Sequence, residues 1–268
     1  GDRPPQEIRT VSHTPMIRRT RKEKVRRILG CTLMALLVVL LGCSFVIARR
    51  HVSYAIHPYR TVIRIVDTGK GRFLREREVA AVLPIDLKDS ISRGVDPDRI
   101  ERDLVDASTY IRSATAFISP STKRLHVVVH ERTPIIRYFR NGTSWYLDDE
   151  GISVPQRQGS AAYVPLAEGT MTDGTIHYVL YPLAQYLYDH SEWSHFFSYI
   201  EIISESKIHL YPRVGTVVFE LHGLETLEQD LAKIPIYYKD IESQVGTNKY
   251  ALVKLSYENQ IVCVKREK

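Results

Sequence analysis

Two stretches of the sequence carry residue types that could bind a metal ion. His190 and His195 flank Glu192, and residues 148–151 read Asp-Asp-Glu-Gly. A spacing of five residues does not place both histidines on one face of a helix, and no third zinc ligand is indicated. The acidic run lacks the alternating ligand spacing of a calcium loop. We therefore interpret the first stretch as a solvated helix end or loop and the second as an acidic turn between strands.

Motifs for nucleotide binding and nucleophilic catalysis are incomplete. Residues 69–71 read Gly-Lys-Gly and lack the third glycine and the lysine placement of a phosphate loop. No Gly-x-Ser-x-Gly occurs, and Cys263 has no histidine near it in the sequence. We predict a protein that is not an enzyme and that uses no cofactor and no metal.

The formal net charge of +6 is confined to the start of the chain. Residues 1–27 carry nine Lys and Arg against three Asp and Glu, so the remaining residues balance. A folded part without a basic excess has no overall field that favours phosphate binding. We therefore predict no nucleic-acid partner.

A long uncharged segment follows the basic one. Residues 28–48 contain no charged side chain, and 21 residues of helix span about 31 Å, close to the thickness of a bilayer's hydrocarbon core. The run exceeds the roughly 7 to 15 apolar residues of a signal peptide. Because the basic cluster precedes it, the positive-inside rule predicts a cytoplasmic N-terminus and an exported C-terminal part.

The first exported region has the pattern of a small α+β domain. Strands are predicted at 61–66, 110–118 and 124–131, and helices at 76–83 and from Asp96-Pro97 onward, where Ile100, Leu104 and Ala107 recur at helical spacing. The order strand, helix, helix, strand, strand favours a three-stranded sheet covered by helices on one face.

Strands dominate the region after Pro134. They are predicted at 135–139, 144–147, 152–154, 163–166, 200–203, 207–211 and 216–221. One helix should run through Ile176 and Leu187 with a kink at Pro182, and another should begin near Leu227 and end near Pro235. The chain closes on a hairpin of 250–257 and 260–265. The terminal strand of such a hairpin is either a sheet edge open to β-strand addition or a paired strand.

Four motifs in this order resemble the FtsQ/DivIB family of bacterial cell-division proteins. Residues 127–134, Val-Val-Val-His-Glu-Arg-Thr-Pro, resemble the family's V-x-V-x-E-R-x-P. Residues 145–151, Trp-Tyr-Leu-Asp-Asp-Glu-Gly, are similar to its Y-x-L/V-D-x-x-G hairpin. Residues 164–169 resemble L-P-x-L-x-G, and residues 213–223 resemble its basic-Gly-x-x-V-x-L-G strand.

The resemblance implies a domain organisation and a function. It implies a basic cytoplasmic tail (1–27), a transmembrane helix (28–48), a POTRA domain (59–132) and a β domain (133–268). It further implies a single-pass protein of the bacterial inner membrane, with a periplasmic C-terminus, concentrated at the division septum. Its role would be a non-enzymatic divisome scaffold that holds FtsB-like and FtsL-like proteins and helps to control septal peptidoglycan synthesis. Other divisome components would bind through the POTRA domain and the membrane span, which also contacts the lipid bilayer.

The resemblance places the partner site on the final hairpin. There the FtsB-like partner adds a strand, and Tyr257 matches the tyrosine of the family's D-L-R-Y motif, whereas Lys254 and Ser256 depart from it. The expected binding residues are Tyr250, Leu252, Lys254, Ser256, Tyr257, Glu258, Asn259, Gln260, Ile261, Val262, Cys263, Val264 and Lys265.

Two functions from other classes remain as alternatives. One is a POTRA-bearing component of protein translocation or envelope assembly, which usually shows several POTRA repeats or a membrane barrel. The other is a membrane-anchored cell-wall enzyme, which should show a nucleophile or a pair of carboxylates in a recognisable setting.

Overall fold

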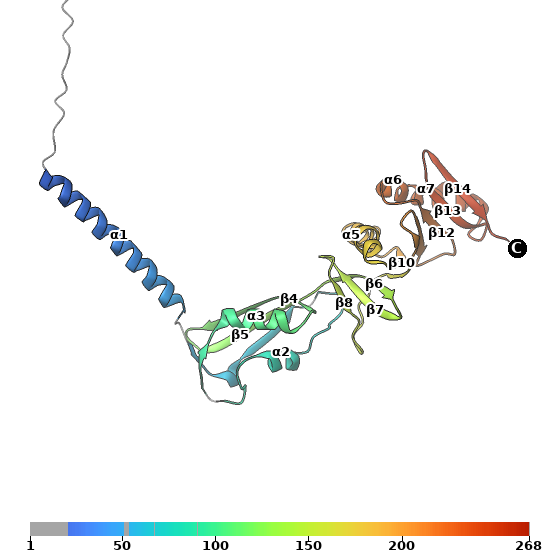
Figure 1. The fold of residues 1–268 in the computed structure, drawn as a ribbon. Coiled ribbons are helices and arrows are strands. Elements are labelled where there is room, and N and C mark those ends of the chain that lie inside the picture. Colours follow the sequence, from blue (N-terminus) through green and yellow to red (C-terminus); the bar gives the residue numbers. More distant parts are fainter. Residues whose placement is uncertain (1–20, 51–53, 67, 90, 268) are drawn as a thin grey trace, which may run out of the picture. The chain divides into compact units, whose positions relative to one another are not determined.

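A computed structural model describes residues 21–50, 54–66, 68–89 and 91–267. The chain divides into two compact units, Gly1–Ser53 and Tyr54–Lys268 (Figure 1). Helix α1 (Arg21–Arg50) is the described part of the first unit. Its side chains are described from residue 29 to residue 44 and are exposed, while residue 28 and residues 45–48 of the predicted span lie outside that range. Judged on the described residues, no helix meets the length and hydropathy required of a membrane span.

The second unit begins with an α+β arrangement in which, among the described residues, three strands form a sheet. Strand β5 is central, parallel to β2 and antiparallel to β4. Helices α2 and α3 come between β2 and β4 in the sequence. The bounds are β2 Val62–Val66, α2 Glu76–Val82, α3 Pro97–Ala107, β4 Ile111–Ser119 and β5 Arg124–Glu131.

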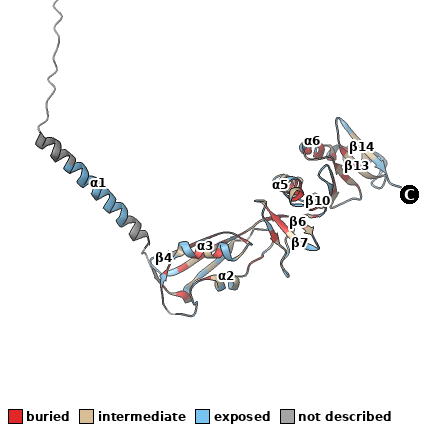
Figure 2. Cartoon of the chain, viewed as in Figure 1, coloured by how far each residue is buried: buried red, intermediate tan, exposed pale blue. Residues whose placement is uncertain are grey.

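Side-chain spacing explains why these elements pack together. In β5, Leu125, Val127 and Val129 alternate with more exposed residues and are fully buried, as a strand with one covered face requires. In α3, Ile100 and Leu104 lie four residues apart and are also fully buried. Figure 2 shows this buried side of the helix against the sheet. The predicted strands and helices thus occur in the predicted order, with one unpredicted strand between the two helices.

The sequence pattern missed two short strands. Strand β3 (Ser92–Val95) lies between α2 and α3 and pairs with β1 (Tyr54–Ile56) in antiparallel orientation. A one-turn helix, η1 (Pro58–Arg60), connects β1 to β2. Ser, Arg and Gly are not typical strand formers, so β3 depends on its pairing with β1 rather than on intrinsic propensity.

The rest of the unit is a strand-rich sheet, with nine strands among the described residues. Their order is β14-β13-β12-β11-β10-β9-β6-β7-β8. The bounds are β6 Pro134–Arg140, β7 Thr143–Asp148, β8 Ser153–Pro155, β9 Leu166–Gly169, β10 Phe197–Ser204, β11 Lys207–Pro212, β12 Val218–Leu221, β13 Tyr250–Tyr257 and β14 Gln260–Lys265. The mixed α+β class with a strand-rich C-terminal part is thus confirmed.

Two helical segments cover one face of this sheet. The first comprises α4 (Asp173–Thr175), η2 (Ile176–Leu180) and α5 (Tyr181–Asp189), and the second comprises α6 (Leu227–Leu231), α7 (Lys233–Ile236), η3 (Tyr237–Glu242) and α8 (Ser243–Val245). Leu180, Leu183 and Leu231 are fully buried and join Phe219 and Val253 of the sheet in one core. The π-helical turn η2 directly precedes Pro182, where the sequence predicted a kink.

Two predicted boundaries are wrong. Strand β9 lies at 166–169 rather than 163–166, because it pairs in parallel with both β6 and β10, while Val164 packs against a separate small cluster around Phe73. The second helix does not end near Pro235 but continues as helical turns to Val245. The chain bends at Ala232, so Pro235 lies in the first turn of α7, where a proline's missing N–H is tolerated.

Candidate partner-binding edge

The final hairpin has the bounds that the sequence predicted. Strands β13 and β14 pair in antiparallel orientation through Glu258 and Asn259, and Asn259 takes the left-handed conformation with φ 55°. Asparagine tolerates this conformation better than most residues, which suits the tight turn. In the described sheet β14 has β13 as its neighbour on one side and no strand on the other. It is therefore an edge strand.

The two faces of β14 differ in character. Ile261 and Cys263 pack against the main core, and Cys263 lies opposite the buried Val253. Val262 and Val264 point to the other face, where Val264 is exposed. Burial raises the pKa of the Cys263 thiol, so the thiol stays protonated at neutral pH and is a poor nucleophile. The strand is anchored on one face and free along its outer backbone.

An ion pair between Lys233 and Asp230 contacts the C-terminal end of β13. Lys233 Nζ lies 3.0 Å from Asp230 Oδ1 and donates to the carbonyl oxygens of Leu255 and Tyr257. Asp230 Oδ2 also accepts hydrogen bonds from Ser256 Oγ at 2.6 Å and Thr226 Oγ1 at 2.9 Å. The last register pair between β12 and β13 is Glu220 with Lys254, so both carbonyls lie past the end of that pairing. Lys233 thus supplies a donor to β13 carbonyls that no longer face β12.

Two of the expected binding residues use their side chains inside the fold. Ser256 donates to Asp230, and Lys254 Nζ lies 3.5 Å from Glu220 Oε1 on the neighbouring strand. Glu220 also contacts His209 Nε2 at 3.0 Å and Lys207 Nζ at 3.4 Å. The side chains of Tyr257, Glu258, Asn259 and Gln260 are exposed. Sequence reasoning missed Glu220, Asp230 and Lys233, because their partners come from other elements.

The charges around Glu220 predict a pH dependence of stability. Burial raises its pKa, but the hydrogen bond from His209 and the charges of Lys254 and Lys207 outweigh this effect, and the net pKa lies below the ordinary 4.5. A lowered pKa stabilises the fold above the unfolded-state pKa, and this stabilisation is lost as pH falls through the folded-state value. We expect Glu220→Gln to be less stable than the parent protein at pH 7. The gap should shrink below about pH 4.5, as measured by urea unfolding at several pH values. A constant gap would contradict the assignment.

A hollow of 480 Å³ lies beside the hairpin turn. It is lined by Gln229, Lys233 and Ile236 from α6 and α7 and by residues 258–261 of the hairpin. Ile236 is 49% exposed and contributes apolar surface to the hollow. A strand added to β14 would end beside this hollow, which could take up a side chain of the incoming segment.

The motif at residues 131–132 connects structural elements. The Glu131 side chain is buried, and its Oε1 accepts hydrogen bonds from the backbone N–H groups of Phe73, at 2.9 Å, and Leu74, at 2.5 Å. Arg132 Nη1 lies 2.9 Å from both Asp148 Oδ2 and Glu150 Oε2. Asp148 Oδ1 in turn accepts from the N–H groups of Glu150 and Ile152. Arg112 pairs with Asp149 and Glu150 of the same run, so the acidic stretch is a structural turn whose carboxylates are paired with two arginines.

The two histidines considered as metal ligands, His190 and His195, have different surroundings. His190 Nδ1 lies 2.8 Å from the Tyr186 carbonyl oxygen and its ring stacks on Tyr186, whereas His195 is exposed in the following loop. Over the described part of the chain, no three His, Cys, Asp or Glu side chains lie close enough to hold a metal ion.

Comparison with known proteins identifies the strand-rich part of the chain. Residues 133–264 match the family model described as FtsQ/DivIB, C-terminal related. A search of curated proteins finds no match. The matched residues run from the first strand of the nine-stranded sheet to its last, β14, and include the open edge. The comparison therefore assigns residues 133–264 to the FtsQ/DivIB C-terminal related family.

Proposed function

We propose that this protein is a non-catalytic scaffold of the division machinery that captures its partner by β-strand addition to β14. Membership of the FtsQ/DivIB-related family supports a role in cell division. The proposed binding mode rests on one observation: the outer backbone of β14 has no strand partner among the described residues. An edge strand presents a row of N–H and C=O groups that pair with an incoming chain.

The hairpin has the properties that a docking edge needs. Its inner face is fixed by Ile261, Cys263 and Val253, and its far strand is held by Lys233, so little ordering is required when a partner binds. Main-chain bonds would supply affinity, while Val262, Val264 and Tyr257 would supply selectivity. Lys254 and Ser256 would act on the partner indirectly, through the packing of β13.

The partners and the cellular setting belong to the same proposal. The partners would be FtsB-like and FtsL-like proteins at the septum, where the complex helps to control peptidoglycan synthesis. Residues 1–27 would lie in the cytoplasm and residues 28–48 would cross the inner membrane, supported by the basic cluster and the uncharged run. Residues 59–132 would form a POTRA domain that contacts other divisome components, and residues 133–268 would form the periplasmic β domain.

Proline substitutions on β14 test the edge. Successive N–H groups of an antiparallel strand point to opposite sides, so one of Val262 and Cys263 donates away from β13. Proline at the outward position should leave the hairpin intact and weaken binding of the FtsB-like protein about a hundredfold, because it removes a ladder donor and its ring crowds the incoming strand. Titration of the full chain with that partner gives the Kd.

Hydrogen exchange and isosteric variants provide the controls. Exchange of the β13 amides identifies which proline variant keeps the hairpin. Val262→Thr and Cys263→Ser keep both N–H groups and should change the Kd by less than about threefold. Parent-like binding by the proline variant with an intact hairpin would rule out strand addition at β14.

A further inference from the structure

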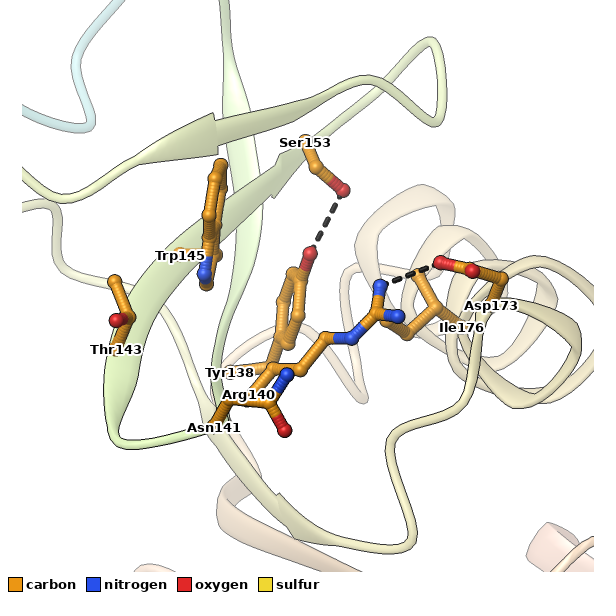
Figure 3. A pocket seen from close by; sticks show the side chains of 8 residues that line it. All are labelled: Tyr138, Arg140, Asn141, Thr143, Trp145, Ser153, Asp173 and Ile176. Atoms are coloured by element: carbon orange, nitrogen blue, oxygen red, sulfur yellow. Dashed lines mark hydrogen bonds and ion pairs between the residues drawn. The ribbon is translucent and has the colours of Figure 1, made fainter.

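A second candidate site lies at the other end of the nine-stranded sheet. A cavity of 460 Å³ is lined by residues of β6, β7 and β8 together with the start of the α4–η2 helix (Figure 3). Clefts of about 300–1,000 Å³ are typical of small-molecule sites. In the order of strands, β7 and β8 are at the far end from β14. A ligand here would not compete with a strand on β14.

Strand register explains how the wall of the cavity is built. Tyr138 lies opposite Trp145, and Arg140 lies opposite Thr143, so all four side chains share one face of the β6–β7 hairpin. Ser153 of β8, opposite Leu147, joins the same face. The Tyr138 side chain is buried, and its hydroxyl donates to Ser153 Oγ at 2.8 Å across the floor of the cavity. Figure 3 shows the Tyr138 and Arg140 side chains extending from the hairpin toward the helix that carries Asp173 and Ile176.

The charges in this cavity cancel. Arg140 Nη1 forms an ion pair with Asp173 Oδ1, and no further charged side chain lines the cavity. The pair lies near the solvent, with 33% of the Arg140 and 88% of the Asp173 side chain exposed, so the lining offers a charged ligand no net opposite charge. The remaining polar groups are the neutral side chains of Asn141, Thr143, Ser153 and Tyr138. The lining therefore favours an uncharged ligand.

The polar and apolar groups are mixed in a way that suits one class of uncharged ligand. Trp145 and Ile176 offer apolar surface, while the amide, the hydroxyls and the guanidinium offer hydrogen bonds. A purely apolar ligand would strip water from these polar groups without replacing it. A sugar ring has C–H groups on its faces and hydroxyls around its rim, so it can stack on an indole while bonding to polar neighbours. We infer that this cavity binds a neutral saccharide, an activity that goes beyond the scaffold function and does not depend on it.

Trp145 provides the signal for a direct test. The chain has two tryptophans, so Trp193→Phe leaves Trp145 as the sole indole fluorophore. The full chain in lipid nanodiscs, free of sugar-based detergent, is titrated with triacetylchitotriose and with cellotriose. We expect a saturable change in Trp145 emission with at least one of them. Because the ligand is neutral and the cavity lining carries no net charge, the Kd should change by less than about twofold between roughly 50 and 500 mM NaCl.

Two variants test the site itself by calorimetry. Trp145→Leu removes the aromatic face, and Thr143→Tyr adds a ring at an exposed strand position and fills the opening without touching the core. Each should weaken saccharide binding by at least about tenfold, whereas Trp193→Phe should bind like the parent protein. Absence of saturable binding of both sugars, or an unchanged Kd in Thr143→Tyr, would overturn the inference. So would a Kd that rises steeply with salt.

Discussion

Lys233→Met should lower the free energy of unfolding of the Tyr54–Lys268 unit by about 3 kcal/mol, one of the largest effects expected of a single substitution here. The side chains of Lys233 and Asp230 are only 17% and 3% exposed, so the substitution leaves a buried carboxylate without its counter-charge. It also removes the donor to the Leu255 and Tyr257 carbonyl oxygens. Urea unfolding followed by tryptophan emission measures the loss.

A double variant separates the ion pair from the rest of the packing. Replacing both charges with apolar residues, Asp230→Leu with Lys233→Met, removes the uncompensated charge, so its cost should fall short of the two single costs combined by about 2 kcal/mol. Additive costs would show that the pair contributes no coupling. Because Lys233 also holds the end of β13, Lys233→Met should further speed hydrogen exchange in β13 and β14.

Glu131→Ala should cost about 2–5 kcal/mol, because it leaves two backbone donors, the N–H groups of Phe73 and Leu74, without their acceptor. Phe73 and Leu74 are themselves buried, so water does not readily replace the carboxylate. Phe73 stacks on Tyr110 and meets Tyr146 edge-on, so loss of its anchor should also loosen these aromatic contacts.

An exposed glutamate in the same region provides the control for Glu131. Glu76→Ala, in the first turn of α2, should change stability by less than about 1 kcal/mol. The two variants are compared by urea unfolding. Equal effects of the two substitutions would show that the hydrogen bonds of Glu131 carry no special weight.

The elements that the sequence predicted correctly are those that contain their own periodicity, turn residues or helix cap. The alternating strands β5, β13 and β14 and the capped helix α3 were predicted within a residue or two, since each carries its own periodicity, turn or cap. Strands β1, β3 and β9 were missed or misplaced because pairing with distant strands, rather than their composition, makes them strands. The helix after Leu227 was cut short because the position of Pro235 within a turn depends on the bend at Ala232.

In the candidate site, too, one part could be predicted from local sequence and another part could not. Its edge hairpin is contiguous in the sequence and could be predicted from local pattern together with family resemblance. Its supports are not contiguous: Asp230 meets Ser256, and Glu220 meets Lys254. Such pairs arise when an α-helix or a neighbouring strand packs against the hairpin, and neither residue type nor spacing in one sequence indicates them. The saccharide cavity likewise joins Arg140 to Asp173 across 33 positions.

The two ends of the nine-stranded sheet set a limit on how many strands this sheet can accept. Strand β8 is three residues long and ends at Pro155, so it offers little backbone for pairing. Among the described residues the nine-stranded sheet thus has one receptive edge, and edge-to-edge growth of this sheet into a fibre lacks a second one. Two copies could still meet β14 to β14 about a twofold axis, which would occupy both edges in a closed dimer. Under the proposed function, self-association and partner capture are therefore mutually exclusive, and the local concentration of the protein would set how much of it is free to recruit.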